Sequence, residues 1–406
     1  MKLAARFVIT GDGSPVEDGA IEIRDGRIAG VGKRREIGAA PDVDYGDAVI
    51  LPGLVNAHTH LELSFLAGAV PPDGDFVDWL RRMIHALSVA PAGEHEVRAA
   101  VALGINQSLG FGVTCVGDIT RWPGWTRPVL AESALRGVSF GEVIAFGRRR
   151  EQLTGRLEAA ASPACQTQRV RCGISPHSPY SLEPEALSRC AQRASEINAS
   201  LCIHLAESPE EEQFTQSAAG RLAEIPRELG IWDAQVRAAG ARSVELCRSC
   251  GLLGPRTVLA HANYVNDDDL GLIAASGASV AYCPRTHAAF GHPPHRFRDM
   301  LRAGINVCVG TDSLASNPSL SVLDELRFLR ERYPDFDALE LIRMGTARGA
   351  VALGLAEAVG AIAPGKAADL AVLALDGGAN RWEAILESTA HPIAVYIDGL
   401  QTSFRG

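Results

Sequence analysis

Eight short apolar segments, each followed by a stretch with helical spacing of apolar residues, occupy the middle of this 406-residue sequence. This alternation over about 52–358 predicts an α/β fold, a parallel (β/α)8 TIM-like barrel, because helices connect neighbouring parallel strands. The run 257–260 is apolar apart from its first residue, which is typical of strands buried on both faces. The stretch of about 208–250 exceeds the length of one connecting helix and predicts a helical insertion. The expected strands begin near Leu54, Val113, Val138, Val170, Leu201, Val258, Val280 and Val307.

Both ends of the chain have patterns typical of β-strands. Residues 20–24 alternate between apolar and charged side chains, and Asp25-Gly26 is a hairpin-turn signal. The run 368–373, near the other end of the chain, has a similar strand-like pattern. Each end is too short to form a sheet domain alone, so we expect residues 1–51 and 359–406 to combine into one small, discontinuous β-sandwich domain beside the barrel.

Charge and cysteine content exclude several classes of protein. The 39 Lys and Arg against 48 Asp and Glu give a net charge of −9, whereas nucleic-acid-binding domains usually carry a basic surface. The sequence contains neither the apolar core of a signal peptide nor an apolar run of about 20 residues. Its nine cysteines are scattered, which predicts reduced thiols in a cytoplasm. We therefore expect a cytoplasmic protein that binds a small molecule rather than nucleic acid or a membrane. The sequence leaves its oligomeric state open, and a homodimer is one of the alternatives.

Polar residues stand where the expected strands end, which is where α/β barrels carry their catalytic groups. His58 and His60 are two residues apart at the end of the first strand, so both imidazoles reach the same side. Imidazoles and a carboxylate that converge on one point suit zinc or iron(II). The ends of four other expected strands carry His177, His204, His261 and Asp312.

In combination, these motifs resemble the amidohydrolase superfamily over nearly the whole chain. Residues 51–60, LPGLVNAHTH, look like its first-strand motif, and residues 362–370, IAPGKAADL, resemble its return into the small β domain. The remaining motifs are similar to the cytosine deaminase-like branch, which contains S-adenosylhomocysteine and guanine deaminases. These motifs occur along the chain in the same order as in that branch: residues 176–181, residues 204–207, His261 and residues 310–313.

The resemblance implies a metal-dependent hydrolytic deaminase that replaces an aromatic ring amino group with oxygen. One divalent metal, zinc or alternatively iron(II), would supply hydroxide at neutral pH. The resemblance implies that Glu207 moves protons to the ring, that His261 lies beside the attacking water, and that His177 contacts the ring. Asp312 would also pass a proton to the departing ammonia. The implied metal ligands are His58, His60, His204 and Asp312.

Lysine is absent between residues 34 and 365. Two-metal members of the superfamily usually bridge their metals with a carboxylated lysine on the fourth strand or with another carboxylate. This chain has His177 at the fourth strand. A one-metal, deaminase-type site is therefore favoured over a two-metal site.

The substrate is expected to be a 6-aminopurine nucleoside. The segment around His287 is most similar to aminodeoxyfutalosine deaminases of menaquinone synthesis, whose substrate carries a benzoate, although related deaminases often have Asn at this position. Arg285 or Arg148 is expected to pair with that carboxylate. Glu62 suits a ribose hydroxyl or an exocyclic group, the alternative being a structural carboxylate. The expected substrate contacts are His177, Glu62, Arg285, His287, Ser313 and Arg148.

Other functions share much of this pattern. Deaminases of guanine or S-adenosylhomocysteine and hydrolases of chlorotriazines or cyclic amides have closely related motifs. A metal-free scaffold on the same barrel is a third class, which the presence of Glu207 and of the four ligand residues disfavours. A nucleic-acid deaminase is disfavoured because its His/Cys/Cys zinc motif is missing from the sequence.

Overall fold

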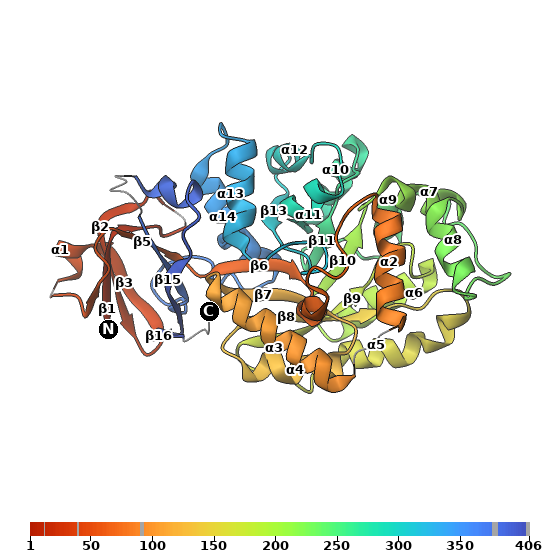
Figure 1. The fold of residues 1–406 in the computed structure, drawn as a ribbon, viewed down its shortest axis with the longest axis horizontal. Helices are drawn as coiled ribbons and strands as arrows, with labels where there is room; N and C mark the ends of the chain where they lie inside the picture. Colours follow the sequence, from red (N-terminus) through yellow and green to blue (C-terminus); the bar gives the residue numbers. More distant parts are fainter. Residues whose placement is uncertain (12, 39, 90–92, 376–380, 403–406) are drawn as a thin grey trace.

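A parallel eight-stranded barrel forms the centre of the protein, as the sequence predicts (Figure 1). The computed structural model describes residues 1–406 apart from 12, 39, 90–92, 376–380 and 403–406. Neighbouring strands pair in sequence order, and each strand begins within two residues of its expected start. The strands are β6 (Leu54–Thr59), β7 (Val113–Thr120), β8 (Arg136–Val143), β9 (Val170–Pro176), β10 (Leu201–Leu205), β11 (Thr257–His261), β12 (Ser279–Tyr282) and β13 (Asn306–Val309).

The barrel closes between its first and last strands. Thr59 forms a parallel bridge with Asp312, just beyond β13. The backbone amides of Thr311 and Asp312 both donate hydrogen bonds to the carbonyl of His58, each over 3.1 Å. Closure therefore places the end of β13 directly against the histidine-bearing end of β6.

Helices surround the barrel, and side chains cap several of them at the first turn. Asn266 accepts a hydrogen bond from the amide of Asp269 at the start of α10, which satisfies a donor that the helix leaves free. Three helices, α7 to α9, lie in the stretch for which the sequence predicts an insertion. The α-helices of the barrel region are α2 (Phe76–Val89), α3 (Glu94–Gly110), α4 (Pro123–Glu132), α5 (Leu153–Ala161), α6 (Pro184–Glu196), α7 (Pro209–Ser217), α8 (Arg221–Glu228), α9 (Ser243–Ser249), α10 (Asp267–Ser276), α11 (Pro284–Ala289), α12 (Phe297–Arg302), α13 (Val322–Arg332), α14 (Ala338–Met344) and α15 (Ala347–Ala352). The 3-10 helices there are η1 (Leu61–Leu66) and η2 (Gly147–Gln152).

Strands from the two ends of the chain share a second sheet, which lies beside the barrel (Figure 1). Its order is β16-β15-β14-β5-β1-β2-β3, with β4 paired to β1, so β5 and β14 join the two ends. Buried Leu3, Ile21, Ile50 and Leu370 belong to one apolar cluster in this sheet. The strands are β1 (Lys2–Val8), β2 (Val16–Arg24), β3 (Arg27–Lys33), β4 (Val43–Asp44), β5 (Ala48–Pro52), β14 (Leu370–Ala374), β15 (Pro392–Ile397) and β16 (Leu400–Gln401). Two short helices accompany them, α1 (Arg34–Ile37) and η4 (Trp382–Leu386).

A buried ion pair connects the barrel to this second sheet. Nε of Arg136, the first residue of β8, donates to Oδ2 of Asp369 over 2.7 Å, and the guanidinium also contacts Asp398. The side chains of Arg136 and Asp369 are 9% and 2% exposed. Removal of one partner would leave the other charge buried and incompletely paired.

We expect Asp369→Ala to lower the free energy of unfolding by about 3 kcal/mol, as is usual when a buried pair loses one member. Urea denaturation followed by circular dichroism measures the change. Glu22→Ala is the matched control, because Glu22 pairs with an Arg24 side chain that is 71% exposed, and little change is expected there. Equal shifts of the urea midpoint in the two variants would contradict the structural importance of the buried pair.

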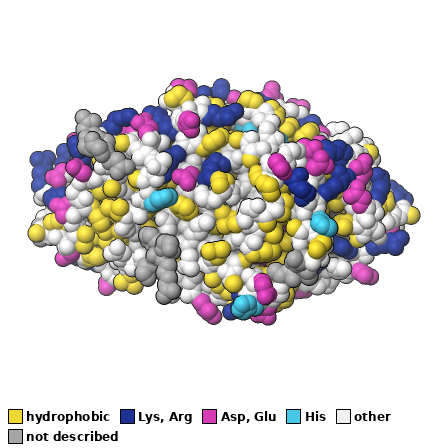
Figure 2. All heavy atoms as spheres, in the orientation of Figure 1, with side chains coloured by type: hydrophobic (Ala, Val, Ile, Leu, Met, Phe, Trp, Pro, Cys, Tyr) yellow, Lys and Arg dark blue, Asp and Glu magenta, His cyan; other side chains and the backbone are white. Residues whose placement is uncertain are grey.

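The surface in view mixes both signs of charge (Figure 2). Lys and Arg are interspersed with Asp and Glu, particularly towards the end of the molecule that carries α2 and α8. Within the ranges that the structure describes, every helix is too short or too polar to cross a bilayer.

Candidate active site

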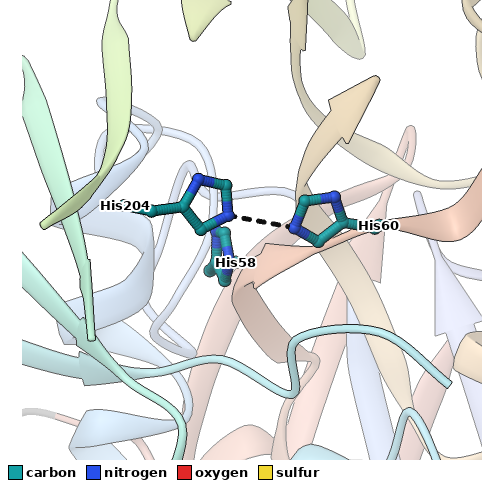
Figure 3. A group of neighbouring side chains, drawn as sticks. All are labelled: His58, His60 and His204. Atoms are coloured by element: carbon teal, nitrogen blue, oxygen red, sulfur yellow. Dashed lines mark hydrogen bonds between the residues drawn. The ribbon is translucent and has the colours of Figure 1, made fainter. Parts of the chain in front are cut away.

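Three histidines converge at the ends of the barrel strands (Figure 3). His58 and His60 come from the end of β6, and His204 comes from β10. Their candidate ligand nitrogens all lie within 4.8 Å of one another, and the Nε2 atoms of His60 and His204 are 3.2 Å apart. The structure thus brings together the three imidazoles that the sequence predicts to act as a group.

Asp312 contributes a carboxylate to the same cluster. Its Oδ1 lies 3.6 Å from Nε2 of His60 and 3.8 Å from Nε2 of His58. The hydroxyl of Ser316 donates to the other oxygen, Oδ2, over 2.6 Å. Oδ1 is therefore the oxygen that Asp312 presents to the histidines.

His204 presents a lone pair rather than a proton to the other two histidines. Nδ1 of His204 is 2.8 Å from the backbone carbonyl of His177, so it carries the proton and Nε2 is left unprotonated. Burial lowers the pKa of His204 to about 4. Burial, with the neighbouring histidines, also holds the pKa of His58 well below its ordinary value. Neutral imidazoles are the form that binds metal ions.

The donor set fits one divalent metal ion. Two nitrogens bound to one tetrahedral zinc at about 2.0–2.1 Å lie about 3.3 Å apart, close to the observed spacing of His60 and His204. Nε2 of His58 is buried and has no hydrogen-bond partner in the described structure. Buried polar atoms without a partner are rare, and a metal ligand is one explanation for such an atom.

Strained backbone occurs at three of the strand ends. Ala206, His261 and Asp312 have φ angles of 50°, 70° and 57°, in the left-handed region that non-glycine residues seldom adopt. Such strain is typical of functional sites, where the surrounding structure imposes it. It coincides here with the residues that carry, or immediately precede, the proposed reactive side chains.

Glu207 and His261 form an acid–imidazole pair beside the cluster. Oε1 of Glu207 lies 3.4 Å from Nε2 of His261, and both side chains are buried. Buried Glu211 supports the Glu207 loop, because its carboxylate accepts the amides of Ala206 and Glu207 over 2.7 and 3.2 Å. Burial, together with the charge of Asp312, raises the pKa of Glu207 well above its ordinary value.

His177 and Glu62 line the cavity next to these groups. His177 lies at the end of β9, with Nδ1 held 2.8 Å from the hydroxyl of Ser181. Glu62 accepts the Thr120 hydroxyl over 2.7 Å and the Arg121 amide over 2.9 Å. Burial raises the pKa of Glu62 to about 8. Glu62 is thus a buried residue of the cavity lining that is hydrogen-bonded to the fold.

Three charged cavity residues were missed by the sequence reasoning, namely Arg121, Glu142 and Arg149. Nε of Arg121 lies 3.7 Å from the buried carboxylate of Glu142. Glu142 lies near the end of β8 and Arg121 directly follows β7, so the strand-end rule applied to every strand would have found both. Arg149 lies within η2, away from any strand end, and has no comparable sequence signal.

Three of the expected substrate contacts lie outside the cavity lining, whereas Ser313 belongs to it. Arg285 is held by acidic residues of α13, with nitrogens 3.7 Å from Asp324 and 3.8 Å from Glu325. The side chain of Arg148 is exposed to solvent. His287 is buried 3.5 Å from the Tyr282 hydroxyl.

The cavity has a volume of about 370 Å³, within the size range of small-molecule sites. Its lining contains His60, His204, Asp312, Glu207 and His261 together with apolar residues of the surrounding helices. Metal-type donors, an acid–imidazole pair and a space for an organic ligand therefore occur in one place.

The fold and this site define a class of protein, the barrel hydrolases that act through a histidine-bound metal. Residues 49–401 match the amidohydrolase family, and this range includes all eight barrel strands and the returning strands β14 to β16. The chain belongs to the amidohydrolase family, a family of metal-dependent hydrolases, and is a hydrolytic enzyme acting on C–N bonds. The resemblance seen in the sequence motifs is thereby confirmed.

Relatives within the family share most of the chain. It is 32% identical to the 5-methylthioadenosine/S-adenosylhomocysteine deaminase of Nitratidesulfovibrio vulgaris strain Miyazaki F, with 92% of this chain and 83% of the relative covered. The fold is similar to Helicobacter pylori aminofutalosine deaminase bound to methylthio-coformycin, with a TM-score of 0.86, 23% identity and coverage of 99% and 100%. An adenosine deaminase of Xanthomonas campestris with bound zinc gives a TM-score of 0.84, 24% identity and coverage of 98% and 92%.

Proposed function

We propose that this enzyme is a deaminase that hydrolyses the 6-amino group of an adenine nucleoside modified at its 5′ position and releases ammonia. The observation that carries the proposal is the Glu207–His261 pair, 3.4 Å apart, in the same cavity as the histidine cluster. The name of the N. vulgaris relative, a deaminase of two 5′-modified adenosines, supports this substrate class.

We propose one divalent metal per chain, held by His58, His60, His204 and Asp312. Zinc is favoured because the X. campestris structure carries zinc, and iron(II) is the alternative. Bound at these residues, the ion supplies hydroxide at neutral pH. A second, bridged metal is disfavoured because no lysine occurs between residues 34 and 365.

The chain's own residues then move the protons. Glu207 takes a proton from the attacking water and delivers it to the ring nitrogen beside the amino-bearing carbon, a role worth about 10²–10⁴-fold in rate. His261 polarises the water, and Asp312 passes its second proton to the amino group. The C–N bond breaks as the carbonyl forms, so water and the amine yield the oxo product and ammonia. His177 and Glu62 orient the ring and the ribose.

Aminodeoxyfutalosine is the proposed substrate within this class, which would give the enzyme a role in menaquinone synthesis. Its carboxylate is proposed to pair with Arg149 rather than with Arg148 or Arg285. Arg149 lines the cavity, and within the described ranges its guanidinium has neither a hydrogen bond nor an ion pair. An unpaired, half-buried guanidinium is well suited to a carboxylate.

An ammonia-release assay with the metal-loaded enzyme tests this assignment. Aminodeoxyfutalosine is expected to react faster than adenosine or S-adenosylhomocysteine, and guanine and a chlorotriazine serve as probes of the alternative activities. Ammonia release that is no faster from aminodeoxyfutalosine would overturn the substrate. Turnover of guanine or of the triazine alone would overturn the nucleoside class.

Arg149→Met is expected to lower kcat/KM for aminodeoxyfutalosine by about 10–100-fold, the range of one lost charge-assisted hydrogen bond. The loss for 5′-deoxyadenosine, which has no carboxylate, is expected to be much smaller. Arg148→Met is the matched control, because this neighbouring side chain is exposed and outside the cavity lining. Equal losses for the two substrates would show that Arg149 does not recognise the carboxylate.

A cytoplasmic location is part of the proposal. All nine cysteines are free thiols, and eight of them are buried. Free thiols in this number are typical of a reducing compartment.

A further inference from the structure

One side of the cavity is formed by a single face of helix α2. Leu80, Met83, Ile84 and Leu87 all line it, and their spacing of three, four and seven residues places them on one stripe of the helix. Leu80, Ile84 and Leu87 are only half-buried. The stripe therefore presents apolar surface that the protein itself leaves uncovered.

Helix α8, from the stretch 208–250, contributes to the same part of the cavity. Leu222, Ile225 and Pro226 line it with the same helical spacing, and Leu222 and Ile225 share an apolar cluster with Met83. We call the space between these two helices the apolar arm, defined by Leu80, Met83, Ile84 and Leu87 of α2 and Leu222, Ile225 and Pro226 of α8.

Ion pairs hold the two helices together. Arg81 of α2 contacts Glu224 and Glu228 of α8 over 2.7 and 3.1 Å. Arg221 of α8 contacts two acids at the start of α2, Asp75 and Asp78, over 2.7 and 2.6 Å. Charges of both signs are visible at this end of the molecule in Figure 2. These partly exposed pairs link both ends of α8 to α2, the two helices that form the arm.

The direction of the substrate decides which group enters the arm. If the amino-bearing carbon lies beside Glu207 and His261, the purine occupies the strand-end side of the cavity. The 5′ carbon lies at the opposite end of an adenine nucleoside from its 6-amino group. Since the strand-end residues and the arm line one continuous cavity, the 5′ substituent is directed into the arm.

We propose that the apolar arm is the subsite for the 5′ substituent, and that this enzyme prefers adenine nucleosides whose 5′ carbon bears an alkyl or aryl group larger than methylthio. This inference rests on the proposed deaminase function for the orientation of the substrate. Leu80, Ile84 and Ile225 act as specificity-determining residues, because they are covered only when the substituent is long enough. A charged aliphatic tail that ends within the arm is disfavoured, because it would lose water against these side chains. The carboxylate of the proposed substrate is instead assigned to Arg149, which lines the same cavity but is not one of the arm's residues.

A ladder of 5′-alkylthio-5′-deoxyadenosines tests the subsite. Titration calorimetry on metal-loaded Glu207→Gln, which is expected to bind these compounds without converting them, measures Kd for the methyl, ethyl, propyl and butyl compounds. Kd is expected to fall about fourfold for each added CH₂. S-adenosylhomocysteine has the same four-carbon reach as the butyl compound but a charged tail, and weaker binding is expected. A Kd that stays level or rises with chain length, or tighter binding of S-adenosylhomocysteine, would overturn the proposal.

Variants locate the effect in the arm. Leu80→Trp fills the arm and is expected to abolish the dependence of Kd on chain length, and Ile84→Thr is expected to weaken it if the larger substitution misfolds. Leu103→Trp is the matched control, a leucine on helix α3 that is 52% exposed, and it should keep the wild-type ladder. If Kd depended on chain length in both arm variants as it does in the wild type, the assignment of the arm would be overturned.

The two proposals can fail separately. A binding ladder without ammonia release from any nucleoside would refute the deaminase function and support the subsite. If ammonia is released but neither kcat/KM nor Kd depends on the chain length of the 5′ substituent, the deaminase function would be supported and the subsite refuted.

Discussion

Glu207→Gln is expected to reduce kcat for ammonia release by about 10²–10⁴-fold while the bound metal remains. Glutamine has the same size but cannot accept the proton of the attacking water. The hydrogen bonds from the amides of Ala206 and Glu207 to Glu211 involve the backbone, so the loop should stay in place. Ammonia release and the metal content per chain, measured by mass spectrometry, give the two readouts.

The control for this variant is Glu185→Gln, at an exposed glutamate in the first turn of α6, where unchanged turnover is expected. The metal content separates two roles for Glu207. Loss of metal from Glu207→Gln would place this carboxylate among the ligands and would contradict the assignment of Asp312 as the fourth one.

Removal of the metal with a chelator is expected to lower turnover by at least about 10³-fold, because stabilisation by a metal is worth several kcal/mol. The protein should also become less stable, since an ion at 1,000 times its Kd contributes about 4 kcal/mol to the folded state. Activity and Tm are measured before chelation, after chelation, and after addition of zinc or iron(II). The ion that restores both identifies the cofactor.

His60→Ala should lose the metal and reproduce the chelated state, whereas His95→Ala, at a side chain that is 92% exposed, should behave as wild type. A metal content below a tenth of an equivalent after gentle purification, with Tm unaffected by added metal, would favour the non-catalytic scaffold instead.

The barrel was predictable because its signals are local. A strand buried on both faces needs a short apolar run, and residues such as 257–260 show it directly. The histidine centre was predictable for a related reason. His58 and His60 share one side of a strand through their spacing, and parallel strands bring their ends to one edge of the barrel, which explains why His204 and Asp312 join them.

The substrate contacts were less predictable because a long polar side chain near a strand end can reach either the cavity or charged residues on a neighbouring helix. Arg285 is close in sequence to a strand end, yet the acids of α13, some forty residues away, hold it outside the cavity. Arg148 and Arg149 are indistinguishable as sequence. Gly147, with a φ of 58°, turns the chain just before them, and only Arg149 lines the cavity.

The sequence by itself determined where the strands lie and which donor types stand at their ends, because hydrophobic period and residue spacing act over a few neighbours. The resemblance of its motifs also indicated the family. Only the tertiary structure decided which arginine meets the cavity and that α2 and α8 form an apolar arm. Those two helices are separated by more than 130 residues in the chain and are joined by ion pairs such as Arg81–Glu224. Contacts of this kind depend on how the elements pack in space. The hydrophobic period of one helix does not indicate which distant helix will pack against it.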